Sequence, residues 1–165
     1  MYVVHSPDYA NFKTPVVFLA GPIQGAPDWQ AEAIRLLKDI LAGIDVSVCS
    51  PRRLGAFPEG AYEQQVDWER FHLNEAAGDG VTMFWLAKEA EHDCARAYAQ
   101  TTRFELAEAL TKHVMGYGGH IVLGIEDGFT GAKYIRKYIQ DNCAGLQIHT
   151  TLEATCKAVG KFFKE

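Results

Sequence analysis

Two patterns of apolar residues alternate along this chain. Short, largely apolar segments resemble strands that are buried on both faces, as in a parallel sheet. Longer stretches place their apolar residues three and four positions apart, which is typical of amphipathic helices. The predicted strands are 16–20, 45–49, 81–86 and 120–125, with a short edge strand at 147–149. The predicted helices are 28–42, 61–77, 102–115, 132–142 and 152–163.

Strands that alternate with helices imply an open parallel sheet with right-handed crossovers. The predicted fold class is therefore α/β, with about five parallel strands and helices on both faces. We expect residues 1–165 to form a single domain, with its core over about 15–165 and an N-terminal extension over 1–14. In such sheets a ligand binds past the carboxyl ends of the strands, where the strand order reverses. The segments expected there are 21–28, 50–60 and 86–105.

Composition narrows the class of partner. Hydrophobic residues make up 48% of the 165 residues, charged residues make up 22%, and the formal net charge is −5. This charge argues against a nucleic-acid or anionic-membrane partner, because both need a basic face. No apolar run approaches the roughly 20 residues of a membrane helix, and the first ten residues lack the features of a signal peptide. We therefore expect a cytoplasmic protein.

Several familiar chemistries lack their sequence signatures. The four cysteines (Cys49, Cys94, Cys143 and Cys156) form no C-x-x-C pair, so reduced thiols and no metal site are expected. Neither the dinucleotide-binding G-x-G-x-x-G pattern nor the P-loop pattern occurs, and no G-x-S-x-G motif is present to supply a hydrolase nucleophile. No cofactor is therefore expected.

Two acidic positions and one turn are the candidates for chemistry. Gly21 follows the first predicted strand, and a glycine there lets the backbone approach a ligand closely. Asp67 and Glu69 are two positions apart, so a regular helix points them in different directions and at most one faces a site. Glu69 lies four residues before Leu73, on the side of that predicted core residue.

Glu105 admits two interpretations. With Thr102 it forms the spacing of a capping box, in which Glu105 has only a structural role at the third helical position. The same position also lies in the first helical turn, where the positive end of the helix dipole favours an ionised carboxylate. Such a carboxylate can attack an electrophilic carbon. Both interpretations stay open at this point.

A series of motifs in order resembles the nucleoside 2-deoxyribosyltransferase-like family. They are Phe18-Leu19-Ala20-Gly21-Pro22-Ile23, Asp28-Trp29, Pro51-Arg52-Arg53, Asp67-Trp68-Glu69, Phe84-Trp85 and Arg103-Phe104-Glu105-Leu106. The resemblance implies a flavodoxin-like sheet and cleavage of the N-glycosidic bond of 2'-deoxynucleosides. The deoxyribose then passes to a free nucleobase without a cofactor. A homo-oligomer is also expected.

The resemblance also implies roles for individual residues. Glu105 matches the glutamate nucleophile that forms a covalent deoxyribosyl-enzyme, and Glu69 matches an acid that holds the deoxyribose or the base. Several members carry a further acid, six residues before the nucleophile, that handles protonation of the leaving base; here that position is Ala99. The residues expected to bind the substrate are Gly21, Pro22, Ile23, Asp28, Trp29, Arg52, Asp67, Trp85 and Arg103.

Two other functions remain open. One is hydrolysis of the N-glycosidic bond in nucleosides or their 5'-monophosphates, for which Arg52, Arg53 and Arg103 are candidate phosphate ligands. The other is a nucleotide-binding module without turnover, because a fold does not dictate a function.

Overall fold

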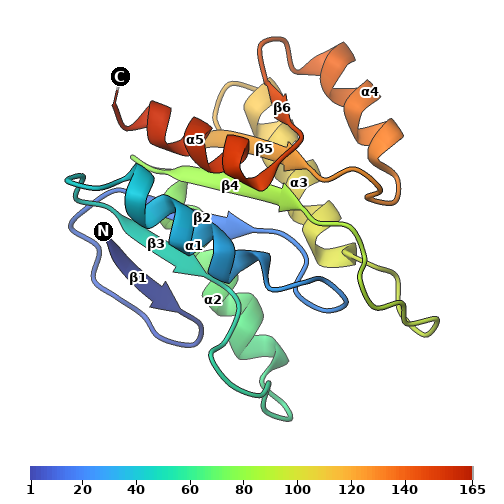
Figure 1. Ribbon diagram of the computed structural model, residues 1–165, viewed down its shortest axis with the longest axis horizontal. Helices are drawn as coiled ribbons and strands as arrows, with labels where there is room; N and C mark the ends of the chain where they lie inside the picture. Colours follow the sequence, from blue (N-terminus) through green and yellow to red (C-terminus); the bar gives the residue numbers. More distant parts are fainter. Residues whose placement is uncertain (165) are drawn as a thin grey trace.

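A single parallel sheet organises the computed structural model, which describes residues 1–164. Its six strands are β1 (Tyr2–His5), β2 (Val16–Ala20), β3 (Ser47–Ser50), β4 (Val81–Leu86), β5 (His120–Ile125) and β6 (Ile148–His149). They lie in the order β1-β3-β2-β4-β5-β6, so the order reverses between β2 and β4 (Figure 1). Without β1 this is the flavodoxin-like order, and the predicted α/β open sheet is confirmed.

Helices cover both faces of the sheet. Over residues 1–164 they are α1 (Trp29–Ile40), α2 (Tyr62–Ala76), α3 (Gln100–Val114), α4 (Ala132–Asn142) and α5 (Leu152–Phe162). Helices α1 and α5 lie side by side on one face, and α2, α3 and α4 cover the other (Figure 1). None of these helices is long and apolar enough to cross a membrane.

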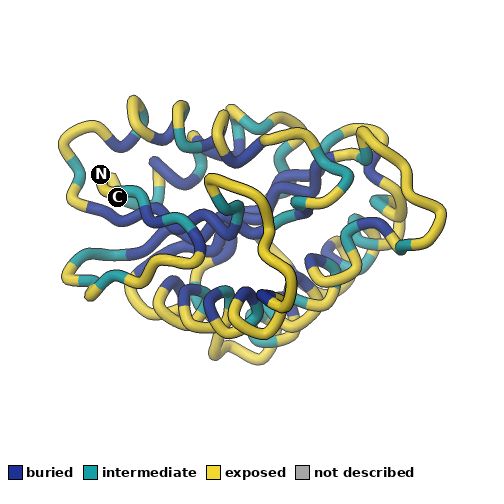
Figure 2. The backbone as a smooth tube through the Cα atoms, turned by 90° about the horizontal axis from the view of Figure 1, so that it is seen from below, coloured by how far each residue is buried: buried dark blue, intermediate teal, exposed yellow. Residues whose placement is uncertain are grey.

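The strand sequences explain the two layers. Successive side chains of a strand point to opposite faces, so Val17 and Leu19 of β2 pack under α1, whereas Phe18 packs on the side of α2. Every residue of β2 and β4 is buried, as predicted for central parallel strands. Figure 2 shows the buried strands between two layers of helices whose outer surfaces are exposed. Each fully buried Leu or Phe contributes about 1.5–3 kcal/mol to this core.

The N-terminal segment belongs to the sheet, which the sequence analysis did not predict. Strand β1 pairs in parallel with β3, and Val4 joins the core on the side of α2. Beyond β1, the hydroxyl of Ser6 and the carbonyl of Asp8 bond to side chains of α2. Only one residue of β1 is buried, so its apolar pattern is too short to predict a strand. The strand is recognised by its pairing with β3.

Helix α3 begins two residues earlier than predicted, and the predicted capping box is wrong. Its N-cap is Ala99, which has a left-handed backbone (φ 55°) and makes no side-chain capping bond. Thr102 is buried within the helix. Glu105 therefore lies in the second turn. The N-cap predicted at Asp28 is confirmed, since its carboxylate accepts a hydrogen bond from the amide of Ala31 at 3.1 Å.

Candidate functional site

A cavity of about 360 Å³ opens at the carboxyl ends of the central strands, beside the point where the strand order reverses. Four segments line it. They are the turn after β2, the loop after β3, the first half of α2, and the residues around the start of α3. This is the place at which open α/β sheets bind ligands. Glu69 from α2 and Glu105 from α3 both line it.

The turn after β2 forms one wall of the cavity. Gly21, Pro22 and Ile23 all line it, as predicted. A Cβ on Gly21 would lie 2.3 Å from the carbonyl oxygen of Trp85 and 2.6 Å from the ring of Trp29, so only glycine fits there. The indole Nε1 of Trp29 donates to the carbonyl of Pro22 at 2.8 Å. Both tryptophans therefore lie behind the turn, in the core, and shape it without lining the cavity.

Glu69 of α2 lines the cavity, and its side chain is held by the buried Gln65 of the same helix. The side-chain amide of Gln65 donates to Oε1 of Glu69 at 2.8 Å and to the carbonyl of Pro51 at 2.8 Å. Asp67 is exposed and lies outside the cavity lining, because it is two residues away from Glu69 on the helix. Gln65 was not among the predicted site residues, although its i, i+4 spacing from Glu69 places both side chains on one helical face.

Glu105 is the most strongly perturbed acid of the cavity. Burial, the neighbouring Glu69 and the nearby Glu108 together raise its pKa to about 8. The expectation that the helix dipole keeps Glu105 ionised is therefore wrong. The residue lies beyond the first turn, where the dipole has faded, and two carboxyl groups that share a site resist a second negative charge.

Glu69 differs from Glu105 in accepting a side-chain hydrogen bond that lowers its pKa. Burial raises the pKa of Glu69, whereas the bond from Gln65 lowers it. Glu105 has no such compensation among the causes that shift its pKa. Glu105, whose pKa is raised to about 8, is therefore the member of the pair that keeps its proton at neutral pH.

Arg52 and Asp28 connect the loop after β3 to the turn after β2 at the edge of the cavity. The guanidinium of Arg52 donates to the side chain of Gln30 at 3.0 Å and to the carbonyls of Ile23 and Pro27 at 3.2 Å each. It also forms an ion pair with Asp28 at 3.2 Å. Arg52 lines the cavity, but these contacts use its donors to hold the turn after β2. Asp28 is exposed and outside the lining.

Arg103 lies away from the cavity. Its Nη2 donates to the carbonyl of Thr130 at 2.5 Å, and its guanidinium lies 4.6 Å from the ring centroid of Phe129. It therefore joins α3 to the loop before α4. Arg96, which the sequence analysis did not select, lines the cavity and donates to the side chain of Gln24.

The mouth of the cavity carries cations and aromatic rings. Arg53 donates through Nε to Gln65 at 3.0 Å, and its guanidinium lies 5.1 Å from the ring centroid of Phe57. Phe57 and Tyr62 line the same mouth and expose 51% and 69% of their surface. Exposed rings at a cavity mouth offer flat apolar surfaces of the kind on which a nucleobase stacks.

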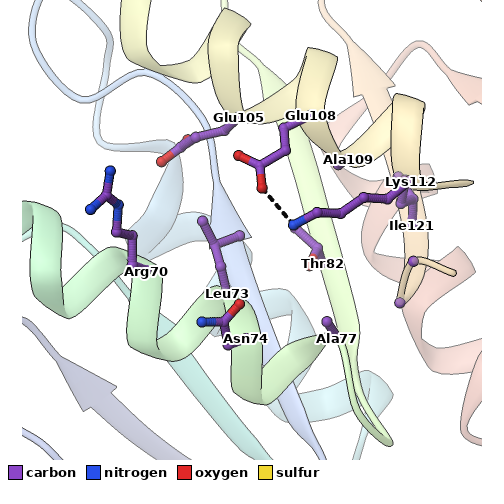
Figure 3. A pocket seen from close by; sticks show the side chains of 12 residues that line it. Arg70, Leu73, Asn74, Ala77, Thr82, Glu105, Glu108, Ala109, Lys112 and Ile121 are labelled. Carbon is purple, nitrogen blue, oxygen red and sulfur yellow. Dashed lines mark hydrogen bonds and ion pairs between the residues drawn. The ribbon is translucent and has the colours of Figure 1, made fainter.

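A second cavity, of about 420 Å³, lies between α2 and α3 (Figure 3). Glu105 lines both cavities, so the two meet at its side chain. Arg70 and Asn74 of α2 face Glu108 and Lys112 of α3 across this gap (Figure 3). Glu108 and Lys112, four residues apart on α3, form an ion pair.

Metal chemistry has no candidate ligand set in residues 1–164, where no group of three or more His, Cys, Asp or Glu side chains is placed to hold an ion. The four cysteines are free.

No protein-family model matches this chain, and no curated protein does either.

Proposed function

We propose that this protein cleaves the N-glycosidic bond of 2'-deoxynucleosides and transfers the deoxyribose to another nucleobase, with Glu105 as the nucleophile. The observation that carries the proposal is the pair of carboxyl groups, Glu69 and Glu105, which line one cavity, where burial and the neighbouring Glu69 raise the pKa of Glu105 to about 8. In a pair of carboxyl groups at a glycosidic bond, the member with the higher pKa usually supplies the proton and the ionised member attacks. In this proposal Glu105 does both, because it gives up its proton through Glu69 as it attacks.

The first half-reaction uses that proton. An oxygen of Glu105 bonds to C1' of the sugar while the bond from C1' to the base nitrogen breaks. The proton of Glu105 moves by way of Glu69 to the leaving base, which departs neutral. Positive charge that develops at C1' is stabilised by the carboxylate that forms as the proton leaves.

The second half-reaction reverses these steps. A nitrogen of the acceptor base attacks C1', the ester bond to Glu105 breaks, and the proton of the acceptor returns to the carboxyl pair. Two displacements at C1' retain its configuration, and the covalent intermediate predicts ping-pong kinetics. The turn at 21–23 and the rings of Phe57 and Tyr62 would hold the sugar and the base.

Hydrolysis of nucleoside 5'-monophosphates is the second candidate, and the cations at the cavity mouth favour it. Arg53 and Arg96 both line the mouth, and arginine binds phosphate in a bidentate manner. Of the other two arginines that the sequence suggested, Arg103 lies outside the cavity lining, and Arg52 holds the turn after β2 through Gln30, Asp28 and the carbonyls of Ile23 and Pro27. A phosphate would therefore bind to Arg53 and Arg96.

Chromatography of reaction products tests these alternatives. The protein is incubated with deoxyadenosine, with and without cytosine, beside Glu105→Gln and the control Glu63→Gln, whose exposed carboxylate lies outside the cavity. Deoxycytidine that forms only with cytosine, and only when Glu105 is present, supports transfer. Adenine released without an acceptor supports hydrolysis.

If neither mixture gives a product, deoxyadenosine 5'-monophosphate is the next substrate. Turnover of that nucleotide alone would favour the second candidate. Full turnover by Glu105→Gln would remove Glu105 as the nucleophile. No turnover of either substrate, with thermal stabilisation of the protein by the nucleotide, would favour a binding module.

A further inference from the structure

Gln65 makes four hydrogen bonds that fix its side chain completely. Its Oε1 accepts from the hydroxyl of Ser6 at 2.7 Å and from Nε of Arg53 at 3.0 Å. Its Nε2 donates to the carbonyl of Pro51 and to Oε1 of Glu69, both at 2.8 Å. The side chain is buried, so water cannot replace these partners easily.

The chemistry of the partners determines which way the amide faces. Nε of Arg53 can only donate, and the carbonyl of Pro51 can only accept. A flipped amide would place its NH₂ against the arginine and its oxygen against the carbonyl. The donor face of Gln65 is therefore directed at Glu69, and a donor aimed at a carboxyl oxygen stabilises the ionised form of that carboxyl.

The other groups around Glu69 act through charge. Glu105 of α3 repels it through charge, and Glu108 lies one turn further along that helix. Arg53 reaches Gln65 from the loop after β3, and Arg52 and Arg96 line the same cavity. Among these groups, Gln65 is the one that donates a hydrogen bond to Glu69.

We propose that Gln65 is a positioning residue that holds Glu69 as the ionised member of the glutamate pair and thereby leaves the shared proton on Glu105. Within the proposed function, on which this part rests, ionised Glu69 receives the proton of Glu105 as C1' is attacked and passes it to the leaving base. Glu69 would then protonate the leaving base, the role that several family members give to an acid six residues before the nucleophile, where this chain has Ala99. Ser6, from the N-terminal segment, supports the same orientation.

Carboxyl titration by ¹³C NMR tests the charge assignment without any need for turnover. Glu69→Gln and Glu105→Gln assign the two resonances in the wild-type protein. We expect Glu69 to ionise at lower pH and Glu105 to ionise near pH 8. If Glu69 is the group that keeps its proton above pH 7, the proposal is overturned, whatever any Gln65 variant does.

Gln65→Met removes the donor and keeps the length, and Gln65→Asn shortens the side chain but keeps it polar in case the methionine variant does not fold. In either variant we expect the two titration midpoints to approach each other by about one pH unit, the effect of losing a hydrogen bond to a charged group. The matched control is Gln64→Met. Gln64 is exposed, and its side chain accepts a hydrogen bond from Arg53 and makes no bond to either glutamate in residues 1–164, so both midpoints should stay unchanged. Unchanged midpoints in a folded Gln65 variant would overturn the proposal.

Kinetics then separate the two proposals. If the wild-type protein turns over nucleosides, Gln65→Asn should lower kcat at least tenfold with little change in KM and should shift the pH profile together with the NMR midpoints. Shifted midpoints without turnover by any form of the protein support the role of Gln65 and refute the proposed function. Turnover with unshifted midpoints refutes the role of Gln65 alone.

Discussion

Gly21 occupies the tightest point of the turn that forms one wall of the cavity. A Cβ there would contact the backbone oxygen of Trp85 at 2.3 Å, and backbone cannot move aside as a flexible side chain can. We expect Gly21→Ala to lower the free energy of unfolding by about 1–3 kcal/mol, the usual effect of overpacking. Urea unfolding measures this change. Gly55→Ala is the control, because a Cβ on Gly55 meets nothing within 4 Å, and an equal loss in both variants would contradict the steric argument.

His72 is a buried histidine with only one of its ring nitrogens hydrogen-bonded in residues 1–164. Its Nδ1 donates to the carbonyl of Trp68 at 2.7 Å, whereas its Nε2 is buried without a hydrogen-bond partner in the described residues. Its ring lies against that of Trp68, with centroids 3.9 Å apart and the ring planes tilted by 31°. A proton on Nε2 would be buried without an acceptor, and burial accordingly lowers the pKa of His72.

The sign of the pH effect on His72 follows from this lowered pKa. The unfolded chain binds the proton below pH 6.5, before the folded protein does, so the folded protein loses stability as the pH falls below that value. We expect His72→Leu to lose less stability than the wild-type protein between pH 7 and pH 5. Unfolding free energies at the two pH values test this, and equal losses would show that His72 is not responsible.

At the scale of elements, Arg52 joins the turn after β2 to the loop after β3. Its guanidinium reaches two carbonyls, Gln30 and Asp28 at once. A lysine keeps the charge but cannot reproduce this fork. We expect Arg52→Lys to lower the unfolding free energy by about 1–2 kcal/mol. Arg35→Lys, in an exposed pair with Glu32, should cost about 0.5 kcal/mol or less. Similar losses in thermal or urea unfolding would show that Arg52 does not fasten the loops.

Elements with a strong internal pattern were predicted with correct limits. Strands β4 and β5 and helix α4 begin and end where the apolar runs and helical spacing indicate. Strand β1 escaped prediction because its neighbour β3, and not its own pattern, defines it. The start of α3 was misplaced because Ala99 makes the turn with a left-handed backbone, which no capping side chain marks in the sequence.

The candidate site was predicted in part, for related reasons. Glu69, Glu105 and the turn after β2 come together because strand order dictates which loops meet. Trp29 and Arg103 lie elsewhere, because their partners are the carbonyls of Pro22 and Thr130. Every residue has a backbone carbonyl, so a side-chain bond to a carbonyl does not depend on which residue supplies it and cannot be predicted from the sequence.

In the molecule as a whole, the N-terminal segment supports both the sheet and the candidate site. It adds β1 to the sheet, and Ser6 and Asp8 extend beyond it to α2. Through Ser6 this edge of the fold reaches the glutamine that orients Glu69. The cavity is therefore formed by segments that the whole sheet brings together, and we expect the carboxyl pair that lines it to affect the stability of the fold.

That effect on stability leads to a prediction about pH. The folded protein raises the pKa of Glu105 to about 8, against 4.5 for an unperturbed glutamate. The folded state therefore binds a proton more tightly than the unfolded chain does, and stability falls as the pH rises from about 4.5 to about 8. The slope that one group contributes is at most about 1.4 kcal/mol for each pH unit. Glu105→Gln removes this group and keeps its shape, so the variant should match the wild-type protein near pH 5 and exceed its stability at pH 8. Urea unfolding across this range measures the difference, with Glu63→Gln as the control for loss of an exposed carboxylate. A difference between wild type and Glu105→Gln that stays constant from pH 5 to pH 8 would mean that Glu105 titrates normally, and the carboxyl pair would then lack the shared proton on which the proposed chemistry depends.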